Sequence, residues 1–113
     1  MPKNTSFHDY IMYALFGETP NITSKTMFGG WGIYKNGVIF AIIAEGELYC
    51  KVSNKNQPVF EKIEGSHPFS YSRKNNKAIT MSYWSIPEEI MEDRERFQNL
   101  INQSVAISRE TLK

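Results

Sequence analysis

The sequence predicts a single α+β domain over residues 1–113, built as a mostly antiparallel sheet flanked by helices. The predicted order of elements is helix, three strands, helix, two strands, helix. Asn36-Gly37 and Glu45-Gly46 separate apolar or alternating runs, as tight turns between antiparallel strands do. Both ends of the chain repeat apolar residues at helical spacing. A chain of 113 residues is long enough to bury a core without disulfides or a metal.

Composition and charge exclude several classes of protein. The chain is 41% hydrophobic and 13% aromatic, which is typical of a globular protein rather than a disordered one. No apolar run is long enough to span a bilayer and the N-terminus lacks a signal-peptide segment, so we expect a cytoplasmic protein without membrane contact. The single cysteine agrees, because oxidising compartments favour paired cysteines. A net charge of +1 lacks the basic excess of avid nucleic-acid-binding domains.

The N-terminal segment predicts a helix that begins near Ser6 and stops at Gly17. Asp9 stands three residues after Ser6 and makes an approximate capping box. Four apolar residues recur at helical spacing, namely Phe7, Ile11, Ala14 and Leu15. Further apolar residues widen this surface and predict that the helix packs on more than one side: Tyr10, Met12, Tyr13 and Phe16.

A glycine-rich segment follows the first predicted strand, Ile22 to Phe28. We expect Gly29, Gly30 and Gly32 to bend or bulge this strand, with close backbone approach, before Trp31 to Tyr34 resume it. The run lacks the lysine and hydroxyl residue of a phosphate-binding P-loop. These glycines are therefore interpreted as a structural motif.

Two further strands follow the turn at Gly37, a residue that tolerates positive φ. Val38 to Ala44 is apolar throughout, which predicts a strand covered on both faces. Glu47 to Val52 alternates between apolar and polar residues, as a half-buried strand does. Its predicted inner face consists of Leu48, Cys50 and Val52.

The second half of the chain predicts a helix, a hairpin and a last helix. Asn54 to Ile63 reads as a short helix capped by one of its asparagines. Phe69 to Arg73 and Ala78 to Trp84 predict the two strands of the hairpin. Pro87-Glu88-Glu89 opens the last helix, because proline and acidic residues favour a helix N-terminus. Its apolar stripe is Ile90, Phe97, Leu100, Ile101, Val105 and Leu112.

Several of these segments resemble the N-terminal domain of the TfoX/Sxy family. The resemblance covers roughly residues 8 to 108 and is carried by Met27 to Tyr34, Phe40-Ala41, Gly46 to Lys51, Pro58 to Phe60, Pro68 to Tyr71, and Met81 to Trp84 with Pro87 to Glu89. It implies an α+β fold similar to secretion-chaperone-like proteins, among which dimers are common. It brings no set of catalytic residues.

The resemblance also implies a role in regulation. The best-known family members regulate natural competence in bacteria, together with the cyclic-AMP receptor protein at particular promoters. Those members carry a further C-terminal helical domain. We expect this chain to be a stand-alone N-terminal-type domain, because its 113 residues leave no room for the second one.

The leading hypothesis is a non-enzymatic protein-interaction module, a regulator or adaptor in bacterial transcription and competence control. Its expected partner is a protein such as the cyclic-AMP receptor protein, and it is expected to form a homodimer and to need no cofactor. Trp31, Tyr83 and Trp84 are the predicted contact residues, because aromatic side chains anchor interfaces. Tyr83 and Trp84 are adjacent in a strand, so they point to opposite faces.

Two alternatives use other parts of the sequence. Aromatic and basic residues at the second hairpin could stack bases and hold phosphates, which makes Tyr71, Arg73, Lys74 and Lys77 a candidate nucleic-acid site. The exposed amides of the bulge at Gly29 to Gly32 could instead hold a small anion in a pocket.

Other reactive side chains are interpreted as structural. Cys50 is expected to be a buried, inert thiol. His8 and His67 lie on different elements without a third partner at ligand spacing, so we expect neither a metal site nor a nucleophile–base pair. The acidic residues that open the last helix suit its dipole and the solvent: Glu88, Glu89, Glu92, Asp93 and Glu95.

Overall fold

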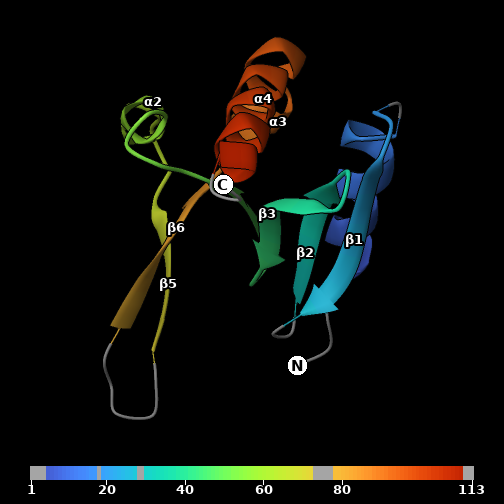
Figure 1. The fold of residues 1–113 in the computed structure, drawn as a ribbon, viewed down its shortest axis with the longest axis horizontal. Helices are drawn as coiled ribbons and strands as arrows, with labels where there is room; N and C mark the ends of the chain where they lie inside the picture. Colours follow the sequence, from blue (N-terminus) through green and yellow to red (C-terminus); the bar gives the residue numbers. More distant parts are fainter. Residues whose placement is uncertain (1–4, 18, 28–29, 73–77, 111–113) are drawn as a thin grey trace.

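The computed structural model describes residues 5–17, 19–27, 30–72 and 78–110, with backbone only at residues 5, 70–72 and 78–81. Figure 1 shows the fold. Six strands form one sheet: β1 (Ile22–Met27), β2 (Gly30–Lys35), β3 (Val38–Ala44), β4 (Glu47–Lys51), β5 (Pro68–Ser72) and β6 (Ala78–Ser85). The helical elements are α1 (Thr5–Asp9), the π-helix η1 (Tyr10–Leu15), α2 (Gln57–Glu61), α3 (Glu88–Met91) and α4 (Arg94–Glu110).

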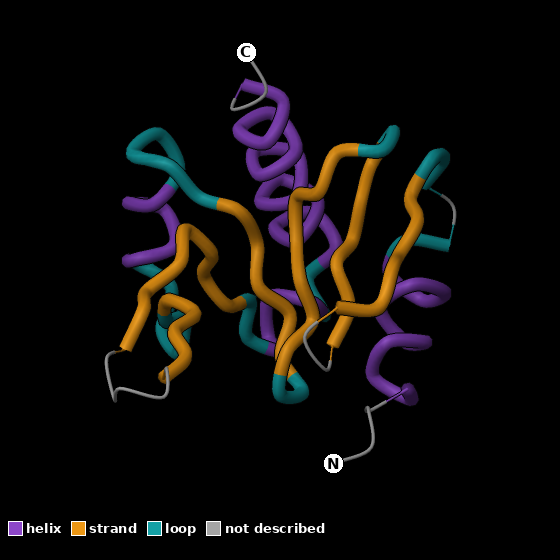
Figure 2. The backbone as a smooth tube through the Cα atoms, turned by 60° about the horizontal axis from the view of Figure 1, so that its bottom comes forward, coloured by secondary structure: helices purple, strands orange, loops and turns teal. Residues whose placement is uncertain are grey.

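The sheet is antiparallel, with the strand order β1-β2-β3-β4-β6-β5. The helices gather on one side of it (Figure 2), and α4 packs on β3 and β4. Their buried side chains join those of the strands in the main core, which includes Ile11 of η1, Phe60 of α2 and Phe97 of α4. The α+β class and the single flanked sheet predicted from the sequence are confirmed.

A smaller apolar cluster occupies the other face of the sheet. Ile42, Tyr49 and Tyr83 are buried there, and partly buried strand residues surround them. The main core takes Ile43, next to Ile42, because neighbouring residues of a strand point to opposite faces. The prediction that β3 is covered on both faces is therefore confirmed.

Both predicted turns are tight hairpin turns with positive φ at their two central residues. Asn36 has φ 52° and Gly37 has φ 82°, between the paired residues Lys35 and Val38. Glu45 and Gly46 repeat this geometry, with φ 53° and 78°. These dihedrals match the right-handed twist of the strands on either side.

The glycine-rich segment is not a bend within one strand. The chain reverses direction between Met27 and Gly30, which pair with each other, so β1 and β2 are separate antiparallel strands. Phe28 and Gly29 lie outside the described residues. At position 30 a Cβ atom would overlap the carbonyl oxygen of Ile43, so glycine lets β2 approach β3 closely.

The irregularity in β2 falls instead between Ile33 and Tyr34. Ile33 pairs with Ala41 and Tyr34 pairs with Ile39, which leaves Phe40 as the extra residue of a bulge in β3. Phe40 and its neighbour Ala41 are both completely buried in the main core. The bulge thus places two successive residues on the helix-covered face.

The first helix changes type after Asp9, where α1 continues as the π-helix η1. The backbone N–H of Phe16 donates to the carbonyl oxygen of Ile11 at 3.1 Å, the i to i−5 spacing of a π-helix. This wider turn leaves Tyr10 40% and Tyr13 74% exposed. The expectation that these two tyrosines pack inside is therefore wrong, whereas Phe16 is buried as expected.

The last predicted helix is two helices, α3 and α4. The break falls at Glu92 and Asp93, where the Oδ1 atom of Asp93 accepts a hydrogen bond from the backbone N–H of Arg96 at 3.3 Å. This side chain satisfies one of the free donors at the start of α4. The helix α2 is shorter than predicted, because Asn56 turns its side chain to Ser53 and Lys51 rather than capping. Leu112 lies outside the described residues.

Candidate interaction groove

Two adjoining hollows lie along α4, the first beside the N-terminal helix and the second beside β1 and β2. The first has a volume of about 470 Å³ and the second about 230 Å³, and Thr19 and Gln98 line both. Together they form what we call the α4 groove, which runs from η1 to the end of β2. Its principal side chains come from four elements: Leu15, Lys35, Met91, Arg94, Gln98, Ile101, Val105 and Arg109.

One stripe of α4 forms the long wall of the groove. Arg94, Gln98, Ile101, Val105 and Arg109 are three or four residues apart, so they share one side of the helix. Fifteen residues separate its two arginines, which places them about 22 Å apart along the axis. The buried residues of α4 hold this wall on the sheet, since Phe97 and Leu100 belong to the main core.

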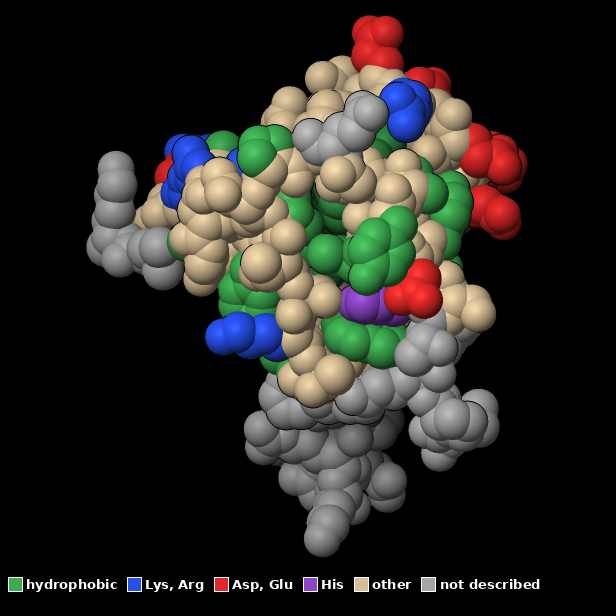
Figure 3. Space-filling model, turned by 90° about the vertical axis from the view of Figure 1, so that its right-hand side faces the viewer, with side chains coloured by type: hydrophobic (Ala, Val, Ile, Leu, Met, Phe, Trp, Pro, Cys, Tyr) green, Lys and Arg blue, Asp and Glu red, His purple; other side chains and the backbone are tan. Residues whose placement is uncertain are grey.

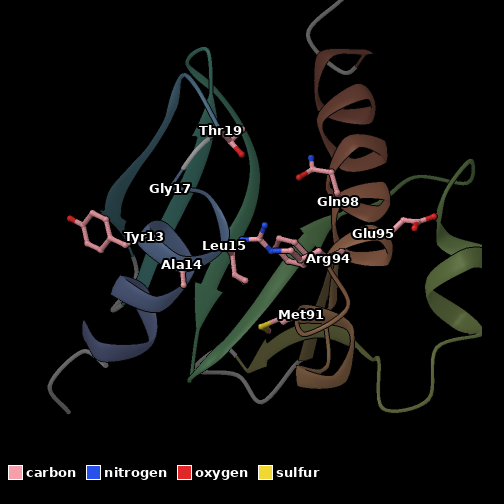
Figure 4. Close-up of a pocket in the computed structure, with 10 residues that line it drawn as sticks. Tyr13, Ala14, Leu15, Gly17, Thr19, Met91, Arg94, Glu95 and Gln98 are labelled. Atoms are coloured by element: carbon pink, nitrogen blue, oxygen red, sulfur yellow. The ribbon is translucent and has the colours of Figure 1, made fainter.

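The opposite wall begins with η1 and the loop that follows it. Figure 4 shows Leu15 extending toward the guanidinium of Arg94, while the ring of Tyr13 points away from α4. At position 17 a Cβ atom would overlap the carbonyl oxygen of Tyr13, so glycine lets the chain turn closely at the end of η1.

Figure 3 views the side of the molecule that carries β1, where hydrophobic side chains gather around a histidine.

The charges that line the groove are mainly positive. Lys35, Arg94 and Arg109 contribute cations, and Glu95 contributes a carboxylate that Figure 4 shows on the opposite side of α4 from Leu15. Within the described ranges, the ion pairs join His8 to Asp9, Lys55 to Glu110 and His67 to Glu47. The three cations of the groove thus keep their charge available to a ligand.

Two of the three predicted contact aromatics are buried. Trp31 and Tyr83 are each only 7% exposed, and Trp84 is half-buried against the main core. Tyr83 and Trp84 do point to opposite faces, as predicted, but each face covers its own side chain. This burial argues against Trp31 and Tyr83 as contact residues, because Trp31 packs against His8 of the N-terminal helix and Tyr83 lies within the second cluster.

His8 has partners that its sequence position did not reveal. Its Nε2 atom lies 2.8 Å from Ser24 Oγ and its Nδ1 atom 3.2 Å from Asp9 Oδ1. His8 and Ser24 thus lie within hydrogen-bonding distance of each other, a pairing that the sequence alone did not indicate. Neither hollow of the α4 groove is lined by Ser24 or His8, so this hydrogen-bond chain links α1 to β1 without an adjoining cavity of the groove.

No described residue of the other sequence-predicted sites lines either hollow. Arg73, Lys74 and Lys77 lie outside the described residues, and of Tyr71 only the backbone in β5 is described. Neither hollow is lined by Gly30 or Gly32, the described glycines of the expected anion site. No group of three metal-ligating side chains occurs among the residues that the structure describes.

The pKa values of Cys50 and His67 are both shifted by their surroundings. Burial raises the pKa of the Cys50 thiol to about 12, although a hydrogen bond with Ser104 opposes this shift. The thiol is completely buried, as predicted. Burial alone would lower the pKa of His67, but hydrogen bonds with the Pro68 carbonyl and with Glu47 raise it above 6.5 overall. The acidic residues around the start of α4 are exposed, as predicted.

The residues that define the groove were missed by reasoning from sequence. Arg94, Gln98 and Arg109 share a helical stripe that is readable from their spacing. A stripe of charged and amide side chains ordinarily indicates a solvated face, however, and nothing local shows that a second wall stands opposite. That wall depends on where the N-terminal helix and Lys35 lie in the fold.

The chain matches one family of known proteins over most of its length. The family model of the TfoX N-terminal domain matches residues 14–108, which include the end of η1, all six strands and nearly the whole of α4. The match covers far more than half of the 113 residues. Among curated protein sequences the chain has no match. No helix in the described ranges is long and apolar enough to cross a membrane. The chain belongs to the TfoX N-terminal domain family.

Proposed function

We propose that this chain is a non-enzymatic protein-interaction module that holds its partner in the α4 groove. The observation that carries the proposal is the groove itself, a cavity lined by apolar side chains and by three cations that pair with no described carboxylate. Membership of the TfoX N-terminal domain family supports a regulatory role. The module acts in the cytoplasm in transcription or competence control, on a protein such as the cyclic-AMP receptor protein.

The groove has the composition of a recognition site. Arginine is enriched where interfaces gain most of their binding energy, because its planar guanidinium combines charge, stacking and several donors. Arg94 and Arg109 stand at the two ends of the stripe, and the amide of Gln98 lies between them. Apolar side chains beneath them, such as Ile101 and Val105, give a partner area to bury.

The non-enzymatic part of the proposal rests on what surrounds the hydrogen bond between Ser24 and His8. Acyl transfer by a serine needs a cavity that admits the substrate beside the hydroxyl group, with donors for the oxyanion. Ser24 and His8 instead link two elements, and both hollows of the groove are lined by other residues. We also propose that the chain forms a homodimer, which light scattering at micromolar concentration tests.

A blocked groove tests the proposal. Gln98→Trp places a bulky ring where the two hollows meet, whereas Arg96→Trp places it on an exposed position of α4 that lines neither hollow. Each tagged variant is used to capture proteins from bacterial lysate at low salt, with half of each sample treated with nuclease. We expect one protein to be retained by the wild type and by Arg96→Trp, after nuclease, and lost with Gln98→Trp.

The opposite results are equally informative. Equal capture by Gln98→Trp and the wild type would refute the groove as the partner site. Retention of nucleic acid alone, lost at higher salt, would refute the protein-interaction proposal. It would favour the hypothesis that Arg73, Lys74 and Lys77 bind nucleic acid, since phosphate contacts weaken steeply with salt. Circular dichroism of each variant shows whether the fold is intact.

A further inference from the structure

The two ends of the α4 groove carry positive charge, and apolar side chains line both hollows on either side of the Gln98 amide. This pattern extends the proposed function, on which the following inference rests. We infer that the segment held by the groove is an acidic peptide in extended conformation, with carboxylates near both ends and apolar side chains between them.

The positions of the cations set the charge pattern of the ligand. Arg94 stands at the η1 end, where Figure 4 shows its guanidinium directed toward Leu15. Arg109 and Lys35 line the hollow at the other end. Because the arginines are about 22 Å apart along α4, an extended segment of about seven residues spans them. A ligand therefore meets cations at both of its ends.

Neighbouring carboxylates do not cancel these charges. Glu110 follows Arg109 in the sequence, but its carboxylate is 2.6 Å from the Nζ atom of Lys55. Figure 4 shows the side chain of Glu95 on the side of α4 away from Leu15, opposite in direction to Arg94. A ligand carboxylate thus gains a favourable interaction in the groove, while a basic peptide meets repulsion there.

The middle of the groove selects for apolar side chains and for a peptide backbone. Ile101, Val105 and Ile22 line the second hollow, and Leu15 and Met91 line the first. The amides of Gln98 and Asn102 share a hydrogen bond of 3.0 Å and both line the second hollow, where they offer further donors and acceptors to a peptide backbone. An apolar floor favours a peptide over a nucleic acid, because a phosphate backbone brings no apolar side chains to bury.

Selection from random peptides tests this inference without knowledge of the natural partner. A phage-displayed library of random peptides, each of about twelve residues and so longer than the groove, is selected on the immobilised wild-type chain. We expect enriched sequences that place Asp or Glu on both sides of an apolar centre. Enrichment of basic or uncharged sequences, or no enrichment, would overturn the inference.

Charge reversal then shows whether the selected peptides occupy the groove. The double variant Arg94→Glu and Arg109→Glu should bind a synthetic selected peptide at least about tenfold more weakly than the wild type, measured by fluorescence anisotropy. Arg96→Glu is the matched control, an exposed arginine on the same helix that lines neither hollow, and it should bind as the wild type does. The neutral double variant Arg94→Gln and Arg109→Gln controls for any effect of the charge reversal on folding.

The outcomes separate this inference from the proposed function. If the double reversal leaves peptide affinity unchanged, or a poly-thymidine oligonucleotide binds the groove more tightly than the peptides, the acidic-peptide inference is wrong. The proposed function would still stand if Gln98→Trp blocks capture of a protein. Loss of peptide binding together with normal capture by Gln98→Trp would instead refute the proposed function.

Discussion

The imidazole ring of His8 stacks on the indole ring of Trp31, with ring centroids 4.5 Å apart and an angle of 27° between the planes. Its Nε2 atom also makes a 2.8 Å hydrogen bond with Ser24 Oγ. One side chain thus joins α1 to β1 and β2. Because α1 continues directly into η1, these contacts hold the N-terminal wall of the α4 groove in place.

Removal of this link should loosen the N-terminal helix. We expect His8→Ala to lower the free energy of unfolding by about 1–3 kcal/mol, the sum of a ring stack and a hydrogen bond. His8→Ala should also speed up amide hydrogen exchange more in η1 than in α4. Urea denaturation followed by circular dichroism measures the first effect. Unchanged stability and exchange would show that His8 does not anchor the wall.

Burial of Trp31 distinguishes a core residue from a contact residue. We expect Trp31→Ala to lower the free energy of unfolding by about 3–5 kcal/mol, because it leaves a cavity in the main core. The exposed aromatic residue Tyr13 is the comparison, and Tyr13→Ala should cost less than about 0.5 kcal/mol. Equal and small losses of stability in both variants would mean that Trp31 is accessible to a partner, as the sequence first predicted.

Two glycines should differ in what they tolerate. Gly30→Ala would drive a Cβ atom into the Ile43 carbonyl group, so we expect a loss of about 3 kcal/mol, the upper end of the usual cost of overpacking. Gly37 has open space around it and a φ of 82°, so alanine there meets only backbone strain, about 1 kcal/mol. Thermal unfolding of the two variants provides the comparison. A larger loss for Gly37→Ala would contradict the close approach of β2 and β3.

His67 should make stability depend on pH. Its Nε2 atom lies 3.1 Å from Glu47 Oε1 and its Nδ1 atom 3.2 Å from the Pro68 carbonyl oxygen, so both nitrogens donate only when the ring is protonated. The folded-state pKa is raised above 6.5, so this contribution is complete below pH 6.5 and is lost as the pH rises through the folded-state pKa.

The measurement is the urea midpoint from about pH 5.5 to about pH 8.5. We expect a small decline with rising pH in the wild type, since both side chains are about half exposed and solvent screens the pair. His67→Gln should remove this decline. A wild-type midpoint that rises across this range without any contribution from His67 would contradict the assignment.

Most of the fold could be predicted from the sequence, because the turns and strands are specified by local residue patterns. Asn36-Gly37 and Glu45-Gly46 require positive φ, and their positions define two hairpins before any tertiary contact is known. The alternation in Glu47 to Val52 likewise gives the inner face of β4. Such features depend only on the backbone and on neighbouring residues.

The groove could not be predicted because it depends on distant elements. The glycine-rich sequence after Met27 suits a bulge within one strand as well as a reversal between two strands. Only the pairing of Met27 with Gly30 in the folded chain distinguishes the two. The π-helical turn that exposes Tyr13 has no clear local signal. Arg94 and Lys35 are far apart in sequence and line different hollows of the same groove, so the groove appears only in three dimensions.

Crosslinking from inside the groove tests most directly whether partners bind there. A photoreactive benzoylphenylalanine replaces Gln98, which lines both hollows, or Arg96, which lines neither. After irradiation in bacterial lysate, adducts of the tagged chain are identified by mass spectrometry. We expect one protein to be joined to the chain from position 98 and not from position 96. Capture of that protein without an adduct from position 98, or equal adducts from both positions, would contradict the groove as the partner site.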